Sequence, residues 1–244
     1  MFCKKIEIDQ TRINFSSDLE NIDISSFIIN ERLKLISYIK RNPDFKNSLE
    51  PVPRDDSLKK APLIVKMMDR ASRKGEVGPM AAVAGTIAEL SLSLLLKKGS
   101  KYSIIDNGGD IALKTNKKIV SGLYAGNSSL SGKIGFEIKA GRAQGICTSS
   151  GTIGHSISFG RSDSVTVFAR QASVADALAS SIANEANGEL DHDAVQNSLE
   201  RADDFKEYLQ GVLVIVGESA GTLGKIPTLV KTDKKRVLGD LFEV

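Results

Sequence analysis

The chain has 244 residues and a mass of 26.2 kDa, and 41% of the residues are hydrophobic, which is enough to form a globular core. Lys and Arg number 33 against 30 Asp and Glu, a formal charge of +3, and aromatic residues make up 5% with no Trp. These values exclude the basic surface with stacking aromatics that nucleic-acid binders carry. We expect a single domain over residues 1–244 and no nucleic-acid partner.

The N-terminus and the apolar stretches indicate a cytoplasmic protein with no membrane partner. The first residues, MFCKKIEID, carry charges and no apolar run follows them, so we expect no signal peptide. The longest apolar region, Met80 to Leu96, is interrupted by Glu89 and by hydroxyl residues, which favours a buried helix over a membrane span. Cys3 and Cys147 are too few for a disulfide framework, so we expect reduced thiols.

The first half of the chain predicts a hairpin followed by three helices. Apolar and polar residues alternate over Lys4–Asp9 and Thr11–Ser17, as in a hairpin with one solvated face. Helical spacing predicts a helix over Ser26–Arg41, then a proline-rich connection, and then helices over Pro62–Lys74 and Pro79–Lys98. The last helix has a smooth face of alanines and one glycine, which suits tight internal packing or a close contact between the subunits of a homo-oligomer.

The second half predicts several strands joined by Gly- and Asn-rich turns, which we interpret as an antiparallel meander. The expected strands of this meander are 103–106, 110–115, 118–126 and 133–139. A charged helix over Asp191–Leu209, an apolar mid-sheet strand over Gly211–Gly217 and a tail with an edge strand should follow. Because strands and helices are grouped and do not alternate, the expected class is α+β, with an antiparallel sheet packed against helices.

Two short polar segments are candidates for ligand binding. Asp106, Asn107, Gly108, Gly109 and Asp110 lie between two expected strands. A type I′ hairpin turn explains an Asn-Gly pair at this place, and the alternative is that the glycines let a ligand approach the backbone.

The second candidate segment for ligand binding lies at residues 148–151. Thr148, Ser149, Ser150 and Gly151 offer hydroxyls and backbone N–H groups that could hold a phosphate, or the hydroxyls could satisfy their own backbone. His155 comes shortly after them and is one of only two histidines. A single His in such a loop is more often structural than catalytic, so it becomes a catalytic candidate only where other groups converge on it.

Asp176 has two interpretations. It follows Ser173 by three positions, which is the spacing of a capping box that satisfies free N–H groups at a helix start. It also precedes Ser180 by four positions on one helical face, so a carboxylate and a hydroxyl could share a Mg²⁺ ion. Mg²⁺ takes few protein ligands and completes its shell with water and phosphate, so two such groups beside a phosphate-binding loop would suffice.

Taken together, these segments resemble the ApbE-type flavin transferases. Val165–Ala169 followed by Ala175–Ser180 resembles the V-x-V strand and the A-D-A-L-A-T helix of that family. The 148–151 segment with His155 resembles its T-S-G loop and following His, and 106–109 resembles its D-x-G-G turn. The three segments occur in the family's order, and the whole chain looks closest to a little-characterised branch of ApbE-like proteins from archaea and anaerobic bacteria.

The resemblance implies a T-fold-related architecture and an activity in which FAD and Mg²⁺ serve to transfer FMN onto a Thr or Ser of an acceptor protein. It implies that Asp176 and Ser180 bind the metal, that 148–151 faces the ligand's diphosphate, and that 106–110 lines the same cleft. His155 would orient a phosphate or the acceptor hydroxyl. The chain departs from the family pattern in four ways: Ser180 replaces a Thr, an extra Ser lengthens the loop, no H-I-x-D-P run follows the His, and the family's N-terminal flavin-contacting blocks have no counterpart before Lys60.

Two alternatives stay open at this point. The branch that the chain resembles has been connected with sulfide assimilation and homocysteine formation in anaerobes, so Cys147, eight residues before His155, could act as a thiolate or persulfide. The simpler interpretation of Cys147 is a small buried thiol. The chain could also be a member of the fold that binds a ligand without catalysis.

Overall fold

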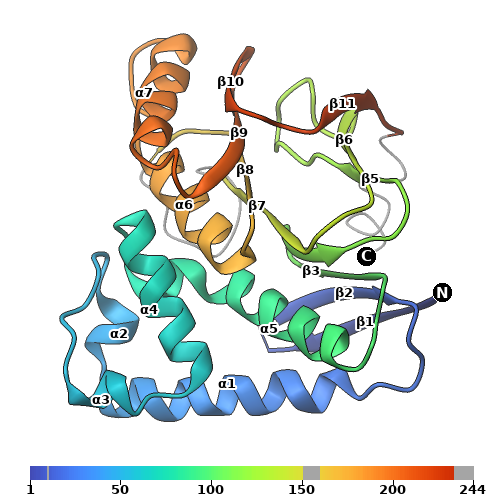
Figure 1. The fold of residues 1–244 in the computed structure, drawn as a ribbon. Coiled ribbons are helices and arrows are strands. Elements are labelled where there is room, and N and C mark those ends of the chain that lie inside the picture. The colour runs from blue at the N-terminus through green and yellow to red at the C-terminus, as the bar shows by residue number, and fades with distance from the viewer. Residues whose placement is uncertain (10, 151–159, 234–244) are drawn as a thin grey trace.

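The computed structural model describes residues 1–9, 11–150 and 160–233 of the chain. Two antiparallel sheets lie against each other, and helices cover the other face of the larger sheet (Figure 1). The α+β class expected from the sequence is confirmed.

The larger sheet has eight strands in the order β1-β2-β3-β4-β7-β8-β9-β10, and each neighbouring pair is antiparallel. Its strands are β1 Phe2–Ile8, β2 Thr11–Ser17, β3 Ser103–Asn107, β4 Asp110–Lys114, β7 Gln144–Ser149, β8 Ser164–Ala169, β9 Leu209–Val216 and β10 Ser219–Gly224. The smaller sheet has the order β11-β6-β5. Its strands are β5 Ile119–Gly122, β6 Ile134–Ile138 and β11 Thr228–Lys231.

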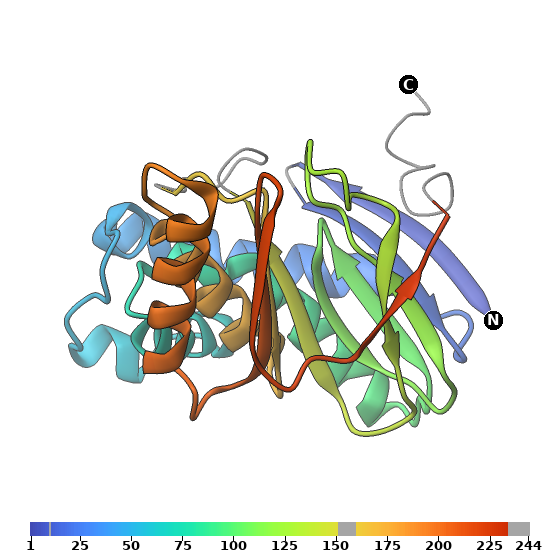
Figure 2. The same ribbon diagram turned by 90° about the horizontal axis from the view of Figure 1, so that it is seen from above.

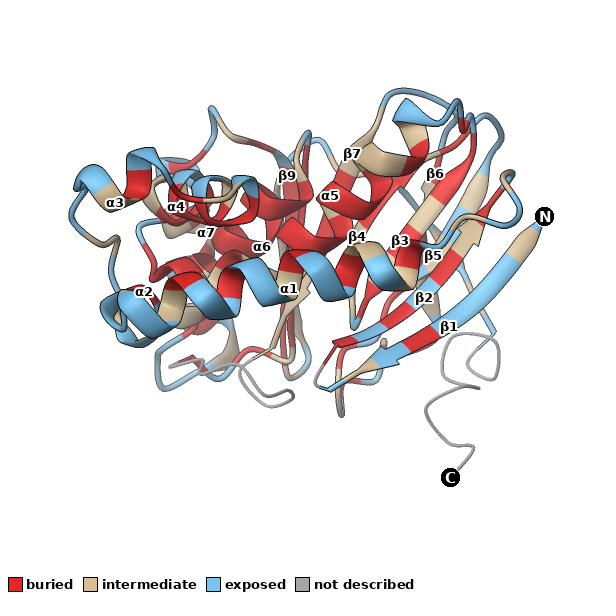
Figure 3. Cartoon of the chain, turned by 90° about the horizontal axis from the view of Figure 1, so that it is seen from below, coloured by how far each residue is buried: buried red, intermediate tan, exposed pale blue. Residues whose placement is uncertain are grey.

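The helices form a layer on one side of the larger sheet (Figure 2). They are α1 Ile24–Arg41, α2 Asp44–Asn47, α3 Asp56–Lys59, α4 Leu63–Gly75, the 3₁₀ turn η1 Pro79–Ala82, α5 Val83–Lys97, α6 Ala172–Asn184 and α7 Asp191–Asp204. The innermost helices, α5 and α6, are the most buried, whereas α1 shows one buried and one exposed face (Figure 3).

Strands β8 and β9 of the larger sheet are buried on both faces, which explains the continuous apolar run of β9. Val212 and Val214 point into the core under the helices, whereas Leu213 packs into a second core beneath the smaller sheet. In that second core the rings of Phe136 and Phe168 meet edge-on with centroids 4.8 Å apart. The strand lies between β8 and β10, so the prediction of an interior strand is confirmed.

The apolar helix is also where the sequence suggested it. Among the described residues, one helical stretch, Pro79–Lys97, is long and apolar enough to cross a membrane by length and composition. In this fold it packs against β3, β4 and α6, and about half of it is buried, as expected of a core helix. Its smooth face lies against α6 of the same chain, which agrees with the tight-packing interpretation.

Two predictions about the elements are wrong. The expected meander is divided, because β4 pairs with β7 and the intervening strands form the smaller sheet, where Phe136 and Ile138 find apolar cover. The proline-rich connection also contains the short helix α3, which begins where the Asp55 carboxylate accepts a hydrogen bond from the Leu58 N–H. Both features depend on contacts that local periodicity does not encode.

Candidate functional site

The candidate site begins at the junction of α5 and α6, where each helix caps the other. Neither helix starts with a side-chain cap of its own, since the N-cap residues are Ala82 and Gln171. Asp176 of α6 instead accepts a hydrogen bond of 2.8 Å from the Gly85 N–H in the first turn of α5. Glu89 of α5 accepts in return from the Ser173 N–H of α6, so each helix satisfies a free N–H group at the start of the other.

Glu89 makes three contacts at the start of α6. It accepts from the Ser173 N–H at 3.0 Å, from the Ser173 hydroxyl at 2.7 Å and from the Gln171 amide at 3.2 Å. The capping box predicted between Ser173 and Asp176 is therefore wrong, because Ser173 lies inside the helix and donates to another helix. Sequence reasoning missed Glu89, and its only signal was a single acid inside an apolar run.

The two helices can cap each other only because they approach closely at Gly85. A Cβ atom at this position would collide with the Ala172 carbonyl oxygen and would lie 2.7 Å from the Asp176 Cβ. Gly145 of β7 has the same role beneath α6, where a Cβ would collide with the Ala172 backbone. The small residues around the site thus allow backbone and side chain of neighbouring elements to meet.

Asp176 is one of two acids that share this place. Asp110 begins β4 directly opposite Cys147 of β7 in the sheet register, and its charge and that of Asp176 act on each other. Burial, and next the repulsion from Asp176, raises the pKa of Asp110 well above its usual value. No basic side chain forms an ion pair with either acid among the described residues.

Asp176 titrates close to neutral pH. Burial raises its pKa to about 7, against hydrogen bonds from the Gly85 and Ala84 N–H groups that favour the charged form. Asp110 also has two hydrogen bonds that favour its charged form, from the Cys147 thiol and the Thr148 N–H, but burial and the repulsion from Asp176 outweigh them. The site is therefore a buried acid pair that is neutralised by protons.

Cys147 lies next to this acid pair as a protonated thiol. Its side chain is fully buried, and its Sγ donates to the Ala172 carbonyl oxygen at 3.2 Å. Burial, followed by the charges of Asp110 and Asp176, raises the pKa of the thiol well above its usual value. These surroundings agree with a buried structural thiol and give no support to a thiolate.

The 106–110 segment contains the two-residue hairpin turn, Gly108 and Gly109, that joins β3 to β4. Gly108 and Gly109 have φ angles of 69° and 102°, and a Cβ on either would meet nothing within 4 Å. The Asp106 carboxylate accepts from the Gly109 N–H at 2.9 Å, and the Asn107 amide donates to the Ala84 carbonyl oxygen at 3.1 Å. The turn is thus tied to the start of α5, and its glycines face open space where a ligand could approach.

The hydroxyl segment is the end of β7 and faces β8. Thr148 Oγ1 lies 3.0 Å from Thr166 Oγ1, and the Ser150 hydroxyl donates to the Ser162 carbonyl oxygen at 3.5 Å. Ser149 is the last residue of β7 and is partly exposed. Because side chains alternate along a strand, Ser149 shares the face of Cys147 and the acid pair, whereas Thr148 lies on the opposite face, with Ile146.

Three further residues predicted for the site, Ser180, Gly151 and His155, have no described contact with the acid pair. Ser180 lies on α6 one turn after Asp176 and is partly exposed. Gly151 and His155 lie outside the described residues. The structure thus brings together Asp106–Asp110, Cys147–Ser150 and Asp176, three segments that are far apart in the sequence.

Comparisons with known proteins show the family and the fold of the chain. The model of the family described as AbpE bacteria matches residues 16–223. A UPF0280 protein of Methanothermobacter thermautotrophicus is 63% identical over 240 residues, which cover 98% of this chain and 92% of that protein. A UPF0280 protein of Methanobrevibacter smithii is 50% identical over 95% of this chain and 97% of its own length.

Two solved structures share the fold at low sequence identity. The flavinyl transferase ApbE of Pseudomonas stutzeri, in its apo form, superposes with a TM-score of 0.53 at 10% identity, covering 98% of this chain and 96% of that one. The ApbE protein of Thermotoga maritima gives a TM-score of 0.51 at 12% identity and covers both chains fully. The chain therefore has the ApbE fold and belongs to the AbpE bacteria family, together with the archaeal UPF0280 proteins.

Proposed function

We propose that the chain binds FAD next to the acid pair and, with Mg²⁺, transfers FMN to a Thr or Ser hydroxyl of an acceptor protein. The observation that carries this proposal is the acid pair itself, Asp110 and Asp176, buried together with no basic partner among the described residues. Such a pair is stabilised by protons or by a cation. A flavin transferase is among the structures that share the fold.

The donors at this place suit a hard divalent cation. Asp176 and Ser180 would hold the ion through a carboxylate and a hydroxyl, and Asp110 adds a second carboxylate nearby. No three acidic, His or Cys side chains gather as a metal cluster in the described part of the chain, so water and ligand diphosphate would complete the coordination. Bound there, Mg²⁺ would offset the charge of the diphosphate during transfer.

The remaining residues would bind and orient the ligand. The open glycines of the 108–109 turn leave room for the ligand beside Asp110, and Thr148–Ser150 offer hydroxyls to phosphate oxygens. In the transfer, the acceptor hydroxyl oxygen bonds to the FMN phosphorus, the bond from that phosphorus to the AMP phosphate oxygen breaks, AMP leaves, and the hydroxyl proton passes to solvent.

Titration calorimetry of the metal-stripped protein with FAD, with and without Mg²⁺, tests this proposal. We expect Mg²⁺-dependent binding that weakens about tenfold or more in Asp176→Asn, because the amide keeps the helix cap but gives up the charge. Asp203→Asn, an exposed acid on α7, is the control for the loss of one charge. Binding that ignores Mg²⁺ and Asp176 would contradict the proposal, and binding without AMP release in the presence of acceptor would indicate a ligand-binding protein.

A further inference from the structure

A groove with a volume of about 310 Å³ lies on the helical side of the molecule, between α4 and the segment that leads into α3. Its lining has four basic side chains, Arg54, Lys59, Lys66 and Arg70, against three acidic ones, Asp55, Asp56 and Asp69. None of these residues belongs to the acid pair, to the glycine turn or to the hydroxyl segment. The groove is therefore separate from the candidate site described above.

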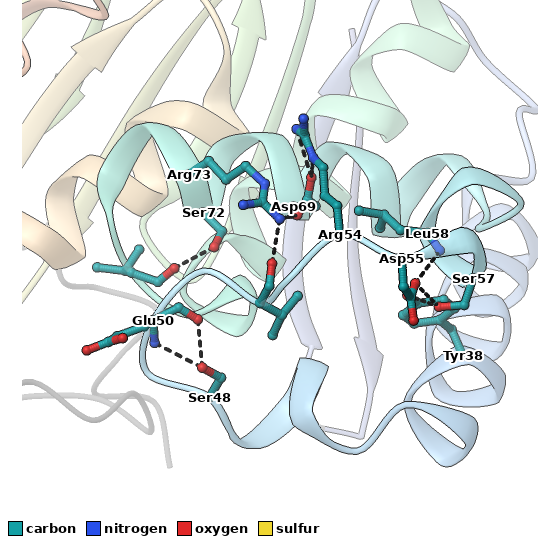
Figure 4. Close-up of polar contacts among 12 residues, drawn as sticks. Tyr38, Ser48, Glu50, Arg54, Asp55, Ser57, Leu58, Asp69, Ser72 and Arg73 are labelled. Atoms are coloured by element: carbon teal, nitrogen blue, oxygen red, sulfur yellow. Dashed lines mark hydrogen bonds and ion pairs between the residues drawn. The ribbon is translucent and has the colours of Figure 1, made fainter.

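The backbone that presents Arg54 is held in place on both sides. Before it, the Val52 carbonyl oxygen accepts from the Arg73 guanidinium, and after it, the Asp55 carboxylate accepts from Ser57 at 2.7 Å and from the Leu58 N–H at 3.1 Å (Figure 4). Such anchoring lowers the conformational entropy that Arg54 would lose on binding a ligand.

The acids at the groove are already engaged within the protein. Asp69 is buried, accepts from Arg54 through Nε at 3.3 Å and Nη2 at 3.2 Å, and pairs with Arg73 at 2.8 Å (Figure 4). Asp56 pairs with Lys59 at 2.7 Å, one turn along α3. One buried carboxylate thus orients two guanidinium groups, and Arg54 keeps a side chain that is 63% exposed.

Two cations at the groove have no partner. Lys66 and Arg70 are exposed, lie one turn apart on α4, and form no hydrogen bond or ion pair with the part of the chain that the structure describes. They line one small space with Arg54, Lys59 and three acids; Asp69 pairs with Arg54 and Asp56 with Lys59, so the four basic side chains of the lining exceed its three acids by one charge. This excess of positive charge would be offset by an anion that bears several oxygens.

From this geometry we infer that the groove binds a small molecule carrying a phosphate or diphosphate group. Arg54 and Arg70 offer guanidinium groups that can bind phosphate oxygens through two parallel hydrogen bonds, and Lys66 adds a point charge. The volume of about 310 Å³ is at the small end of ligand pockets, which suits a compact phosphorylated compound. The inference does not depend on flavin transfer at the acid pair.

Titration calorimetry of the whole chain with pyrophosphate tests the inference, in the presence of EDTA so that a Mg²⁺-dependent site stays silent. We expect binding by the wild-type protein and a loss of about tenfold or more in the double variant Lys66→Met with Arg70→Met. Lys97→Met with Lys98→Met removes the same charge from exposed positions at the end of α5 and should bind as the wild type does. A parallel titration with ADP shows whether a nucleoside part adds affinity.

The outcomes separate this groove from the acid pair. Pyrophosphate binding that survives in the Lys66→Met, Arg70→Met variant, or that falls equally in the Lys97→Met, Lys98→Met control, would overturn the inference. So would an absence of binding by the wild type to pyrophosphate and ADP alike. Asp176→Asn should leave the binding unchanged. Because the altered side chains are exposed, urea unfolding should show that both double variants stay folded.

Discussion

Two buried aspartates, Asp69 and Asp176, show two ways in which one fold can neutralise an acid. Asp69 of α4 has two arginines as partners, and its exposure is 3%. Asp176 of α6 is 8% exposed, accepts from backbone N–H groups, lies near Asp110 and Cys147, and forms no ion pair with a basic side chain among the described residues. Asp69 is neutralised by two arginines, one of which, Arg54, lines the groove. Asp176 is neutralised by a proton, whose place a metal ion could take.

The same substitution at both places gives the sharpest comparison. Asp69→Asn leaves two guanidinium groups without their counter-charge, one of them largely exposed, so we expect a loss of about 2–3 kcal/mol in the free energy of unfolding. Asp176→Asn keeps a hydrogen-bond acceptor for α5 and removes a repulsion, so at pH 8 we expect no loss or a gain of about 1 kcal/mol. Urea unfolding at pH 8 measures the free energy of unfolding of both variants. Equal losses would mean that Asp69 and Asp176 are not neutralised in different ways.

The helix contact beneath Asp176 should be sensitive to a single methyl group. Gly85→Ala places a Cβ against the Ala172 carbonyl oxygen, so we expect a loss of about 1–3 kcal/mol in the free energy of unfolding. Gly141→Ala is the matched control, because its nearest neighbour to an added Cβ is a carbonyl oxygen 3.9 Å away. If both variants unfold at the same urea concentration, α5 and α6 are not in the contact described.

The pH dependence of stability tests how the acid pair is neutralised. The pKa of Asp176 is about 7 in the folded chain, against an ordinary value of 3.8. Between about pH 4 and pH 7 the folded chain therefore keeps a proton on Asp176 that the unfolded chain has lost. Stability should therefore fall as pH rises from about 4 to 7, by on the order of 1 kcal/mol per pH unit. Urea midpoints across this range measure the slope, which should be shallower in Asp176→Asn and unchanged in Asp203→Asn.

The reactivity of the two cysteines tests whether Cys147 is a buried thiol. Cys3 is exposed and Cys147 is buried beside the acid pair, so a thiol reagent should modify Cys3 alone in the native protein and both residues in urea. The Cys3→Ser variant should then show no native reactivity. Rapid native modification of Cys147 in that variant would contradict the buried-thiol description and favour the role in sulfur chemistry.

The sequence predicted local features well and long-range ones poorly. The hairpin of β1 and β2, helix α1 and the apolar strand β9 all follow from periodicity, because each is determined by neighbours along the chain. The described parts of the motif segments lie near one another, with Asp110 opposite Cys147 in the sheet and close enough to Asp176 for their charges to interact. The partner of Asp176 was missed, because the Gly85 N–H is 91 residues away in the sequence and no local pattern encodes it.

The basic groove could not be found from sequence for the same reason. Lys66 and Arg70 look like an ordinary solvated face of a helix, and only the fold places Arg54 opposite them. The separate smaller sheet was likewise hidden, since its strands have the same alternation as those of the larger sheet. Which strands pair is decided by apolar cover such as that between Phe136 and Phe168.

The central claim is that the acid pair exchanges protons for a cation when the diphosphate ligand binds. Calorimetric titration of the metal-stripped protein with FAD and Mg²⁺ at pH 6, in two buffers of different ionisation enthalpy, gives the number of protons released. Because the pKa values of both acids are raised, we expect the wild type to release at least one proton per site and Asp176→Asn to release about one fewer. Binding by the wild type without proton release, or equal release by the variant, would contradict the account.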